Sequence, residues 1–212
     1  MRKKNVLLNT LFIVLLLSTT VNGQYSSLHS ISCQQVQAVG IPSAKFNYFA
    51  SSQEKSQWCW AASIQMVLNY YGVAITQSQI VQRTYGSNLV NWTGSFQAIT
   101  ANLNNWSVDN KGKAYTVTAS LNWGAPHPTI LIQQLSQGRP IILAYASGPN
   151  SGHAVVITGV TYVNTYQGPY IQTIIVRDPW PSPENIKNTG RVEYPGAMLA
   201  SRMQAYWYIL VY

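Results

Sequence analysis

The sequence contains few charged residues. Only 8% of its 212 residues are Asp, Glu, Lys or Arg, about a third of the roughly 25% usual in soluble domains. Five of these residues are acidic and 13 are basic, so the net charge is +8 at pH 7. Because 47% of the residues are apolar, the chain has enough material for a core, which excludes an intrinsically disordered protein. We expect a neutral, hydrogen-bonding surface, as many secreted proteins have.

Cysteine is equally scarce, with Cys33 and Cys59 only. This count excludes a disulfide-rich scaffold. A single disulfide between them would block the Cys59 thiol until reduction, but we favour an unpaired Cys33. The sequence also lacks internal repeats and low-complexity linkers, so its length is best explained by one domain.

The N-terminus has the layout of a secretory signal peptide. Three cations, Arg2–Lys4, precede the apolar run Val6–Leu17, and small or polar residues fill Ser18–Gly23. Residues 1–23 are therefore expected to be cleaved, which predicts a secreted or periplasmic protein. The apolar run is shorter than the roughly 20 residues of a spanning helix, so we expect no stable membrane anchor after cleavage. The remaining net charge of +5 includes no basic cluster, and no nucleic-acid partner is expected.

Residues 24–45 are polar and weakly periodic, which indicates an N-terminal arm or a short propeptide, and residues 46–212 form the expected domain. Apolar spacing and capping residues predict helices in its first half; these cover Trp58–Tyr71, Thr76–Gly86 and Phe96–Leu103. Later segments show strand-like patterns; these cover Ala114–Ser120, Pro140–Ser147, His153–Val163, Tyr170–Asp178 and Tyr206–Tyr212, with a short helix at Thr129–Ser136. This order predicts an α+β fold with an antiparallel sheet.

Cys59 is expected at the N-terminal end of the first long helix. The positive end of a helix dipole favours a thiolate and lowers the pKa of a cysteine. A backbone N–H at that position has no partner within the helix, so it can bind an oxyanion. Gln53, six residues earlier, is a candidate for the second oxyanion donor. The alternative role for Cys59 is that of a buried structural thiol.

His153 begins an apolar strand and follows Gly152, which leaves room for an approaching substrate backbone. An imidazole at such a strand end can face a cleft and act as the base for Cys59. A histidine with no catalytic role is the alternative. Of the two competitors, His29 lies in the N-terminal arm and His127 lies between two prolines.

Asp178 ends an apolar strand, and Trp180 follows two residues later. We expect the Asp178 carboxylate to accept a hydrogen bond from Nδ1–H of His153 and thereby orient the ring. Trp180 is expected to cover this hydrogen bond. The alternative is an aspartate that starts a turn before Pro179. Asp109 is a weaker candidate, because it lies in a polar loop and ends no apolar strand.

These motifs together resemble the papain-like cysteine peptidases, in which a Gln precedes a Cys–Trp pair by six residues. Gln53 and Cys59–Trp60 match that pattern, and Gln57–Ala62 (QWCWAA) resembles the compact bacterial branch, with its staphopains and plant-delivered effector proteases. The segments Leu135–Ile142 and Gly152–Gly159 are similar to that branch and to leader-peptide peptidases. Asp178–Trp180 resembles the third motif of the family.

The resemblance implies a two-lobed papain-like fold that carries the triad Cys59, His153 and Asp178. It further implies an oxyanion hole with Gln53, supporting roles for Trp60, Gly152 and Trp180, and a peptide or protein substrate. No metal or organic cofactor is implied, and any proteinaceous inhibitor is unknown.

Two departures accompany the resemblance. Asp178 stands where papain has Asn, and the segment 24–45 is too short to resemble the propeptides of the lysosomal and plant relatives. Two other functions stay open: a cell-wall amidase with the same thiolate chemistry, and a non-catalytic secreted binding module on this scaffold. The Gln53 and Trp60 context disfavours the amidase, and the presence of all four catalytic residue types disfavours the binding module.

Overall fold

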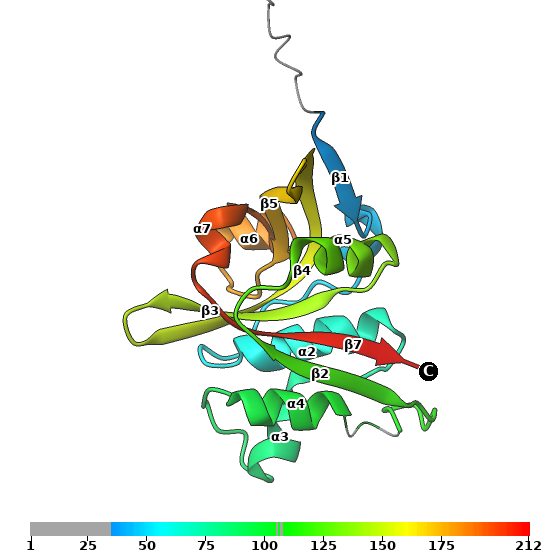
Figure 1. The fold of residues 1–212 in the computed structure, drawn as a ribbon. Coiled ribbons are helices and arrows are strands. Elements are labelled where there is room, and N and C mark those ends of the chain that lie inside the picture. Colours follow the sequence, from blue (N-terminus) through cyan, green and yellow to red (C-terminus); the bar gives the residue numbers. More distant parts are fainter. Residues whose placement is uncertain (1–34, 105, 107) are drawn as a thin grey trace, which may run out of the picture. The chain divides into compact units, whose positions relative to one another are not determined.

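The computed structural model describes residues 35–104, 106 and 108–212, and in this part helices dominate the first half and strands the second (Figure 1). The helices are α1 (Ser43–Phe46), α2 (Cys59–Tyr70), α3 (Gln77–Tyr85), α4 (Phe96–Asn104), α5 (Pro128–Ser136), α6 (Pro183–Lys187) and α7 (Gly196–Ala200). The strands are β1 (Gln37–Gly40), β2 (Val117–Trp123), β3 (Ile141–Gly148), β4 (Ser151–Thr165), β5 (Gly168–Arg177), β6 (Arg191–Pro195) and β7 (Met203–Val211). The α+β prediction is confirmed.

The described strands form one antiparallel sheet in the order β2-β7-β3-β4-β5-β6, with β1 added to β4. Its central strands are apolar on both faces, because helices cover both. In β3, Ile142 and Ala144 belong to the core on the α2 side, whereas Ile141 and Leu143 belong to the core on the opposite face. This alternation follows from the two-residue period of a strand.

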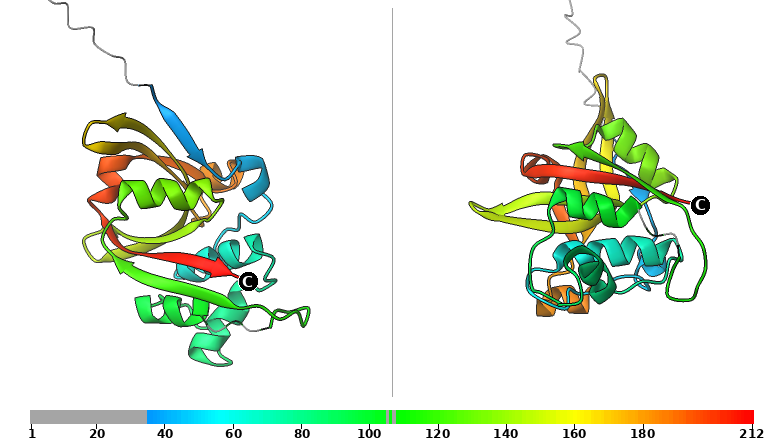
Figure 2. Two further views of the ribbon diagram at one scale, coloured as in Figure 1. Left: turned by 45° about the vertical axis from the view of Figure 1, so that its right-hand side comes forward. Right: turned by 90° about the horizontal axis from the view of Figure 1, so that it is seen from below.

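Helices α2, α3 and α4 lie together at the lower end of the molecule in Figure 1, and α5, α6 and α7 lie above the strands β2 and β7. Figure 2 shows the same grouping from a second direction. Helix α2 packs against β3 and β4, and α5 packs against β1, β4 and β5. The fold therefore places the start of α2 beside the strands that carry the second half of the site.

Local sequence signals fix the helix boundaries. Helix α3 begins with a capping box in which the Thr76 side chain accepts from the Gln79 backbone and Gln79 in turn accepts from Thr76. Gly86 follows the helix with a φ of 82° and Gly72 follows α2 with a φ of 88°. Both glycines have a positive φ, which a residue without a Cβ adopts without steric cost.

The strand predicted at Ala114–Ser120 lies three residues later in the structure, at Val117–Trp123. These bounds coincide with the pairing to β7, which runs from Val117↔Val211 to Trp123↔Ala205. The Asn104 side chain also accepts from the Ala119 backbone N–H at 2.8 Å and donates to the Ala119 carbonyl at 3.0 Å, and so ties the middle of this strand to the end of α4. This contact between distant residues leaves no trace in the hydropathy pattern.

Five short elements were not predicted from the sequence: β1, α1, α6, β6 and α7. Strand β1 lies within the expected arm and is mostly exposed, but it pairs with β4 through the register Gln37↔Tyr162 to Gly40↔Gly159. A Cβ on Gly40 would lie 2.5 Å from the Gly159 Cα, so this close approach of the two backbones requires glycine at position 40. These elements are too short to show a period of their own.

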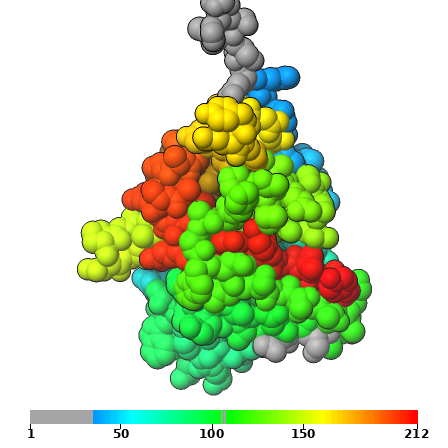
Figure 3. All heavy atoms as spheres, in the orientation of Figure 1, coloured from blue at the N-terminus to red at the C-terminus, as the bar shows by residue number. Residues whose placement is uncertain are grey.

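The expected signal peptide, the first half of the expected arm, His29 and Cys33 lie outside the described residues, so the predictions made for them stay untested. Among the helices of the described part, none has the length and hydrophobicity needed to cross a bilayer. The β3–β4 hairpin stands out from the body, as the yellow-green projection in Figure 3 shows.

Candidate functional site

Cys59 is the first residue of α2, as the sequence predicts. Its thiol is free and partly exposed. The helix has no acidic residue in its first turn and no side-chain cap from Trp58. The positive end of the helix dipole therefore faces the thiol without a competing carboxylate. At this position the Cys59 backbone N–H has no acceptor within the helix.

Two tryptophans flank Cys59 and fasten it to a loop. The indole N–H of Trp58 donates to the Val90 carbonyl at 2.8 Å, and that of Trp60 donates to the Trp92 carbonyl at 3.2 Å. Both indole side chains are buried, with 1% and 2% exposed. The start of α2 is thus held by two aromatic anchors whose polar atoms are satisfied, a role that the sequence analysis did not assign to Trp58.

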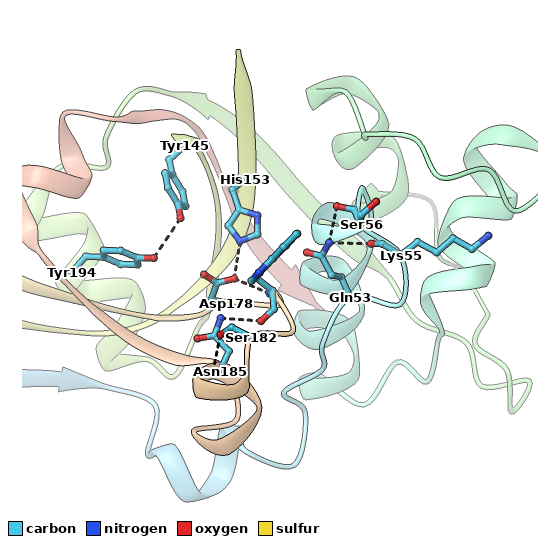
Figure 4. Close-up of polar contacts among 10 residues, drawn as sticks. Gln53, Lys55, Ser56, Tyr145, His153, Asp178, Ser182, Asn185 and Tyr194 are labelled. Carbon is cyan, nitrogen blue, oxygen red and sulfur yellow. Dashed lines mark hydrogen bonds and ion pairs between the residues drawn. The ribbon is translucent and has the colours of Figure 1, made fainter. Parts of the chain in front are cut away.

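His153 lies near the start of β4 and faces Tyr145 on β3. The β3–β4 register places Tyr145 directly opposite His153, and the two rings meet edge to face at 5.8 Å. The Tyr145 hydroxyl lies 3.5 Å from that of Tyr194 on β6. Figure 4 shows this tyrosine pair on one side of the imidazole and Asp178 below it. Tyr145 therefore restricts the ring orientation of His153.

Asp178 follows the last residue of β5 and binds His153. The distance between Nε2 of His153 and Oδ1 of Asp178 is 2.7 Å, and the two side chains are 13% and 10% exposed. The expectation that Nδ1 makes this contact is wrong. Strands β4 and β5 pair side by side, and Nε2, the ring nitrogen farther from the His153 backbone, reaches the carboxylate that follows β5. Because Nε2 binds Asp178, Nδ1 is the nitrogen available to a second partner.

The electrostatics of His153 reflect both partners. Burial disfavours the charged ring, but the hydrogen bonds to Asp178 and Cys59, and the charges of these two groups, raise the pKa of His153 from 6.5 to about 9. An imidazolium is therefore favoured at neutral pH, which is the form that pairs with a thiolate.

The loop after Asp178 supports the carboxylate. The Trp180 backbone N–H donates to Asp178 Oδ1 at 2.8 Å, and the Asn185 side chain donates to the Trp180 carbonyl at 2.9 Å. The Trp180 side chain itself is 49% exposed. Trp180 thus supports Asp178 through its backbone, and the expected cover by its indole stays a prediction.

Gln53 lies between the Cys59 segment and the Asp178 loop. Its backbone N–H donates to the Pro179 carbonyl at 2.8 Å. Its side-chain Nε2 donates to the carbonyls of Lys55 and Ser56 at 3.0 and 2.8 Å, whereas its buried Oε1 has no partner. Figure 4 shows the carboxamide between Ser56 and the Asp178 cluster. In this arrangement Nε2 of Gln53 donates to two backbone carbonyls of the loop before α2.

Cys59 and His153 line a common cleft of about 280 Å³. Its walls contain no Asp, Glu, Lys or Arg, and the other residues that line it are Trp60, Thr93, Gly94, Phe96, Ile99, Ala144, Asn150, Gly152, Ala154 and Gln204. A Cβ on Gly94 would lie 2.4 Å from the Trp60 ring. Within the described residues, no cluster of three or more His, Cys, Asp or Glu side chains could hold a metal ion.

The rival residues have other roles. Asp109 accepts hydrogen bonds from the backbone N–H groups of Lys111 and Lys113, both at 2.9 Å, and of Ala74 at 3.3 Å. Burial opposes the Asp109 charge, but these hydrogen bonds outweigh it and lower the pKa of Asp109. His127 is exposed and precedes the first residue of α5, Pro128. Asp109 thus organises a turn, and the structure brings together Cys59, His153 and Asp178.

Comparison with known proteins supports the same interpretation. Residues 45–210 match the family model described as the Peptidase_C39 like family. No curated protein gives a significant match. The peptidase domain of Streptococcus ComA, a bi-functional ABC transporter involved in a quorum sensing pathway, has a similar fold. Its TM-score is 0.51 at 12% identity, over 75% of this chain and 95% of that one.

Two further solved structures are similar at lower TM-scores. A double glycine motif protease from an AMS/PCAT transporter, in complex with the leader peptide, gives 0.47 at 18% identity, covering 74% of this chain and 87% of that one. Procathepsin L2 from the larval midgut of Tenebrio molitor gives 0.46 at 11% identity, covering 81% and 67%. Because the family model matches residues 45–210, which are most of this chain, the chain belongs to the Peptidase_C39-like family. It is a cysteine peptidase with a papain-like α+β fold.

Proposed function

We propose that the protein is a secreted cysteine endopeptidase with Cys59 as nucleophile, His153 as general base and acid, and Asp178 as orienting group. One observation carries the proposal. The His153 ring is hydrogen-bonded to Asp178 through Nε2 at 2.7 Å and lines the same cleft as Cys59, the first residue of α2. A thiol, an imidazole and a carboxylate gathered in this way are the parts of an activated nucleophile with its base and orienting group.

The expected reaction proceeds through an acyl-enzyme. The Cys59 thiolate attacks the carbonyl carbon of a peptide, and a C–S bond forms. As the C–N bond breaks, His153 gives its Nδ1 proton to the leaving amine. Water then attacks the thioester, His153 takes the water proton, and release of the carboxylic acid regenerates the thiolate. Asp178 stabilises the imidazolium and fixes its orientation throughout.

The oxyanion of the tetrahedral intermediate needs two donors. The Cys59 backbone N–H supplies the first, since it lies at the open start of α2. We assign the second to Gln53 Nε2. This atom already donates to Lys55 and Ser56, so binding of the oxyanion must replace one of these contacts. Gln53→Ala should lower kcat about 10²- to 10³-fold, the usual effect of losing one such donor.

Supporting roles are proposed for three further residues. Trp60 fixes the start of α2 through its bond to the Trp92 carbonyl. Trp180 supports the carboxylate through its backbone N–H. Gly152 lines the cleft, and a Cβ there would meet no protein atom nearer than 3.9 Å, so the folded protein itself does not require glycine at this position. The bound peptide is the neighbour for which the space is kept.

Secretion rests on the sequence of residues 1–23, in which three cations precede an apolar run too short to span a bilayer. Mass spectrometry of the N-terminus of the protein, expressed in a secreting host, tests this part. A new N-terminus near residue 24 in the exported fraction is expected, and a full-length chain in the membrane fraction contradicts it.

Labelling with a thiol-directed epoxide, together with hydrolysis of a peptide library, tests the activity. We expect wild-type protein to be labelled at Cys59, His153→Ala to react slowly, and Cys59→Ala to remain unlabelled. Equal labelling of wild type and Cys59→Ala overturns the assignment. Purified cell-wall fragments serve as the competing substrate, and their cleavage without peptide cleavage would favour the amidase.

A further inference from the structure

Arg177 is a buried cation that the proposed reaction does not use. It ends β5, directly before Asp178, and is 1% exposed. Its guanidinium donates to the Thr189 carbonyl at 3.0 Å, to the Thr189 hydroxyl at 2.9 Å and to the Ser43 carbonyl at 3.3 Å, and it lies 5.7 Å from the Phe46 ring centre. The described residues place no carboxylate in an ion pair with it. Burying an arginine without a counter-ion costs free energy. We therefore expect its hydrogen bonds to have a structural role that offsets this cost.

Thr189 is the only non-glycine residue in the described part with a positive φ, at 51°. A β-branched residue in this conformation is strained by roughly 1–3 kcal/mol and persists only where its surroundings hold it. Arg177 binds both the carbonyl and the hydroxyl of Thr189. The single hydroxyl proton faces two acceptors, the Asn188 carbonyl at 2.6 Å and the Asn47 side chain at 2.9 Å. Arg177 therefore holds two acceptors of the strained residue at once.

The next residue, Gly190, contacts the backbone of Asp178. The Asp178 N–H donates to the Gly190 carbonyl at 2.7 Å. A Cβ on Gly190 would lie 2.6 Å from the Asp178 carbonyl oxygen, so the two segments touch. The conformation of Thr189 determines where Gly190 lies, and Gly190 determines where the Asp178 backbone lies.

The geometry points to Arg177 as a positioning residue for Asp178, acting through Thr189 and Gly190. The inference rests on the proposed function of Asp178 as the group that orients His153. Arg177 itself touches neither His153 nor the cleft. The planar guanidinium of Arg177 binds two acceptors on Thr189 and a third on Ser43 at once. The compact ammonium of a lysine could not reach all three acceptors in this geometry.

The charged and titratable groups around this unit are few. His153 faces Asp178, Cys59 and Tyr145, and Tyr145 contacts Tyr194. Arg177 lies opposite Arg191 in the β5–β6 register. Burial and the Arg191 charge lower the pKa of Arg177 to about 10, so it stays a cation over the range in which His153 titrates.

The test measures how Arg177→Met changes turnover and the titration of His153. We expect kcat to fall at least about tenfold with a near-constant KM, because displacement of a catalytic group acts mainly on the chemical step. The basic limb of the pH profile should shift below about 9, and the NMR titration of the His153 ring should shift with it. Lys187→Met is the matched control, because it removes an exposed cation at the end of α6 and should change neither quantity.

A double-mutant cycle with Asp178→Ala separates positioning from general stability. In the Asp178→Ala background, Arg177→Met should change kcat less than about twofold, because its target is gone. An equal loss in both backgrounds, or a lower melting temperature with unchanged kcat and unchanged His153 titration, overturns the inference. Arg177→Lys and Thr189→Val give the same two readouts if Arg177→Met does not fold, and the same outcomes decide.

The NMR titration also distinguishes the two proposals from each other. An inactive wild-type protein refutes the proposed function, whereas an unchanged His153 pKa in Arg177→Met refutes the positioning role whether or not the wild type is active.

Discussion

The two sides of the site are built differently. On the helical side, Cys59 is placed by a helix start and by buried indoles that donate to loop carbonyls. On the sheet side, His153 and Asp178 are placed by strand register and by a loop in which Thr189 is strained and Gly190 lies against the Asp178 backbone. Large buried rings resist displacement because every shift costs many contacts. The contact of Thr189 and Gly190 with the Asp178 backbone, which we call the clamp, depends on only a few atoms. Single substitutions there should therefore lower activity with less loss of stability than substitutions of the buried indoles.

The largest effect is expected for Cys59→Ser, which keeps the size of the side chain but removes the thiolate. We expect kcat/KM to fall at least about 10³-fold, since loss of a nucleophile removes most of the catalysis. The melting temperature should stay close to that of the wild type. Retention of more than a tenth of the activity would contradict the role of Cys59.

Asp178→Ala should come next, with kcat lower by about 10²- to 10⁴-fold, as is usual when the orienting carboxylate is lost. Asp178→Asn keeps an acceptor for Nε2 and for the Trp180 N–H but removes the charge, and should retain more activity. Because the charge and hydrogen bond of Asp178 raise the pKa of His153 to about 9, both variants should shift the basic limb of kcat/KM to lower pH. An unmoved limb would show that Asp178 does not face the catalytic ring.

Gly190→Ala probes the clamp directly. Gly190 and Gly112 both have a positive φ, at 72° and 76°, but a Cβ meets Asp178 only at Gly190 and has open space at Gly112. Both alanine variants should lose about 1–2 kcal/mol of stability from backbone strain, and Gly190→Ala should lose more, because its Cβ would lie 2.6 Å from the Asp178 carbonyl oxygen. Only Gly190→Ala should also lower kcat, by about tenfold. Equal kinetics for the two variants would show that the clamp does not position Asp178.

Trp60→Phe tests the aromatic anchor on the helical side. It keeps a buried ring but leaves the Trp92 carbonyl without its donor, which should cost about 1–3 kcal/mol of unfolding free energy. Trp207→Phe is the matched control, because its indole donates to the Thr100 hydroxyl at 2.8 Å, outside the cleft lining. Similar melting temperatures with a several-fold lower kcat only for Trp60→Phe would support the anchor, and identical kinetics would count against it.

The smallest effect concerns stability against pH. The folded protein raises the pKa of His153 from 6.5 to about 9. This group therefore contributes stability that is fully present below about pH 6.5 and is lost as the pH rises through about 9. The difference in melting temperature between wild type and His153→Gln should shrink over that window. His127→Gln, which changes an exposed histidine, should show no such trend.

Much of the helical side could be predicted from the sequence. The capping box of α3, the glycines after α2 and α3, and the start of α2 at Cys59 all depend on residues close together in the chain. The same holds for the spacing of Gln53 and Cys59, which a local pattern can carry. The resemblance to papain-like peptidases rested on Gln53 and Cys59–Trp60 together with the later motifs around His153 and Asp178, and it is confirmed at the level of family and fold.

The sheet side could be predicted only in part. His153 and Asp178 were identified because each lies at the end of an apolar strand, but the ring nitrogen that joins them was wrong. The choice of Nε2 depends on how β4 and β5 lie beside each other. The clamp by Gly190 and the buried cation Arg177 were missed, since a glycine after a threonine, or an arginine in a strand, occurs in many kinds of local structure.

The sequence by itself determined which residue types were available and which helix started at the nucleophile, because helix caps and apolar periods are short-range properties. The tertiary structure alone decided that Nε2 of His153 binds Asp178, that β1 joins the sheet, and that Thr189 holds a left-handed conformation. These features arise where distant segments exclude water from one another. There, an unpaired polar group or a strained residue is tolerated only if the surrounding fold compensates for it.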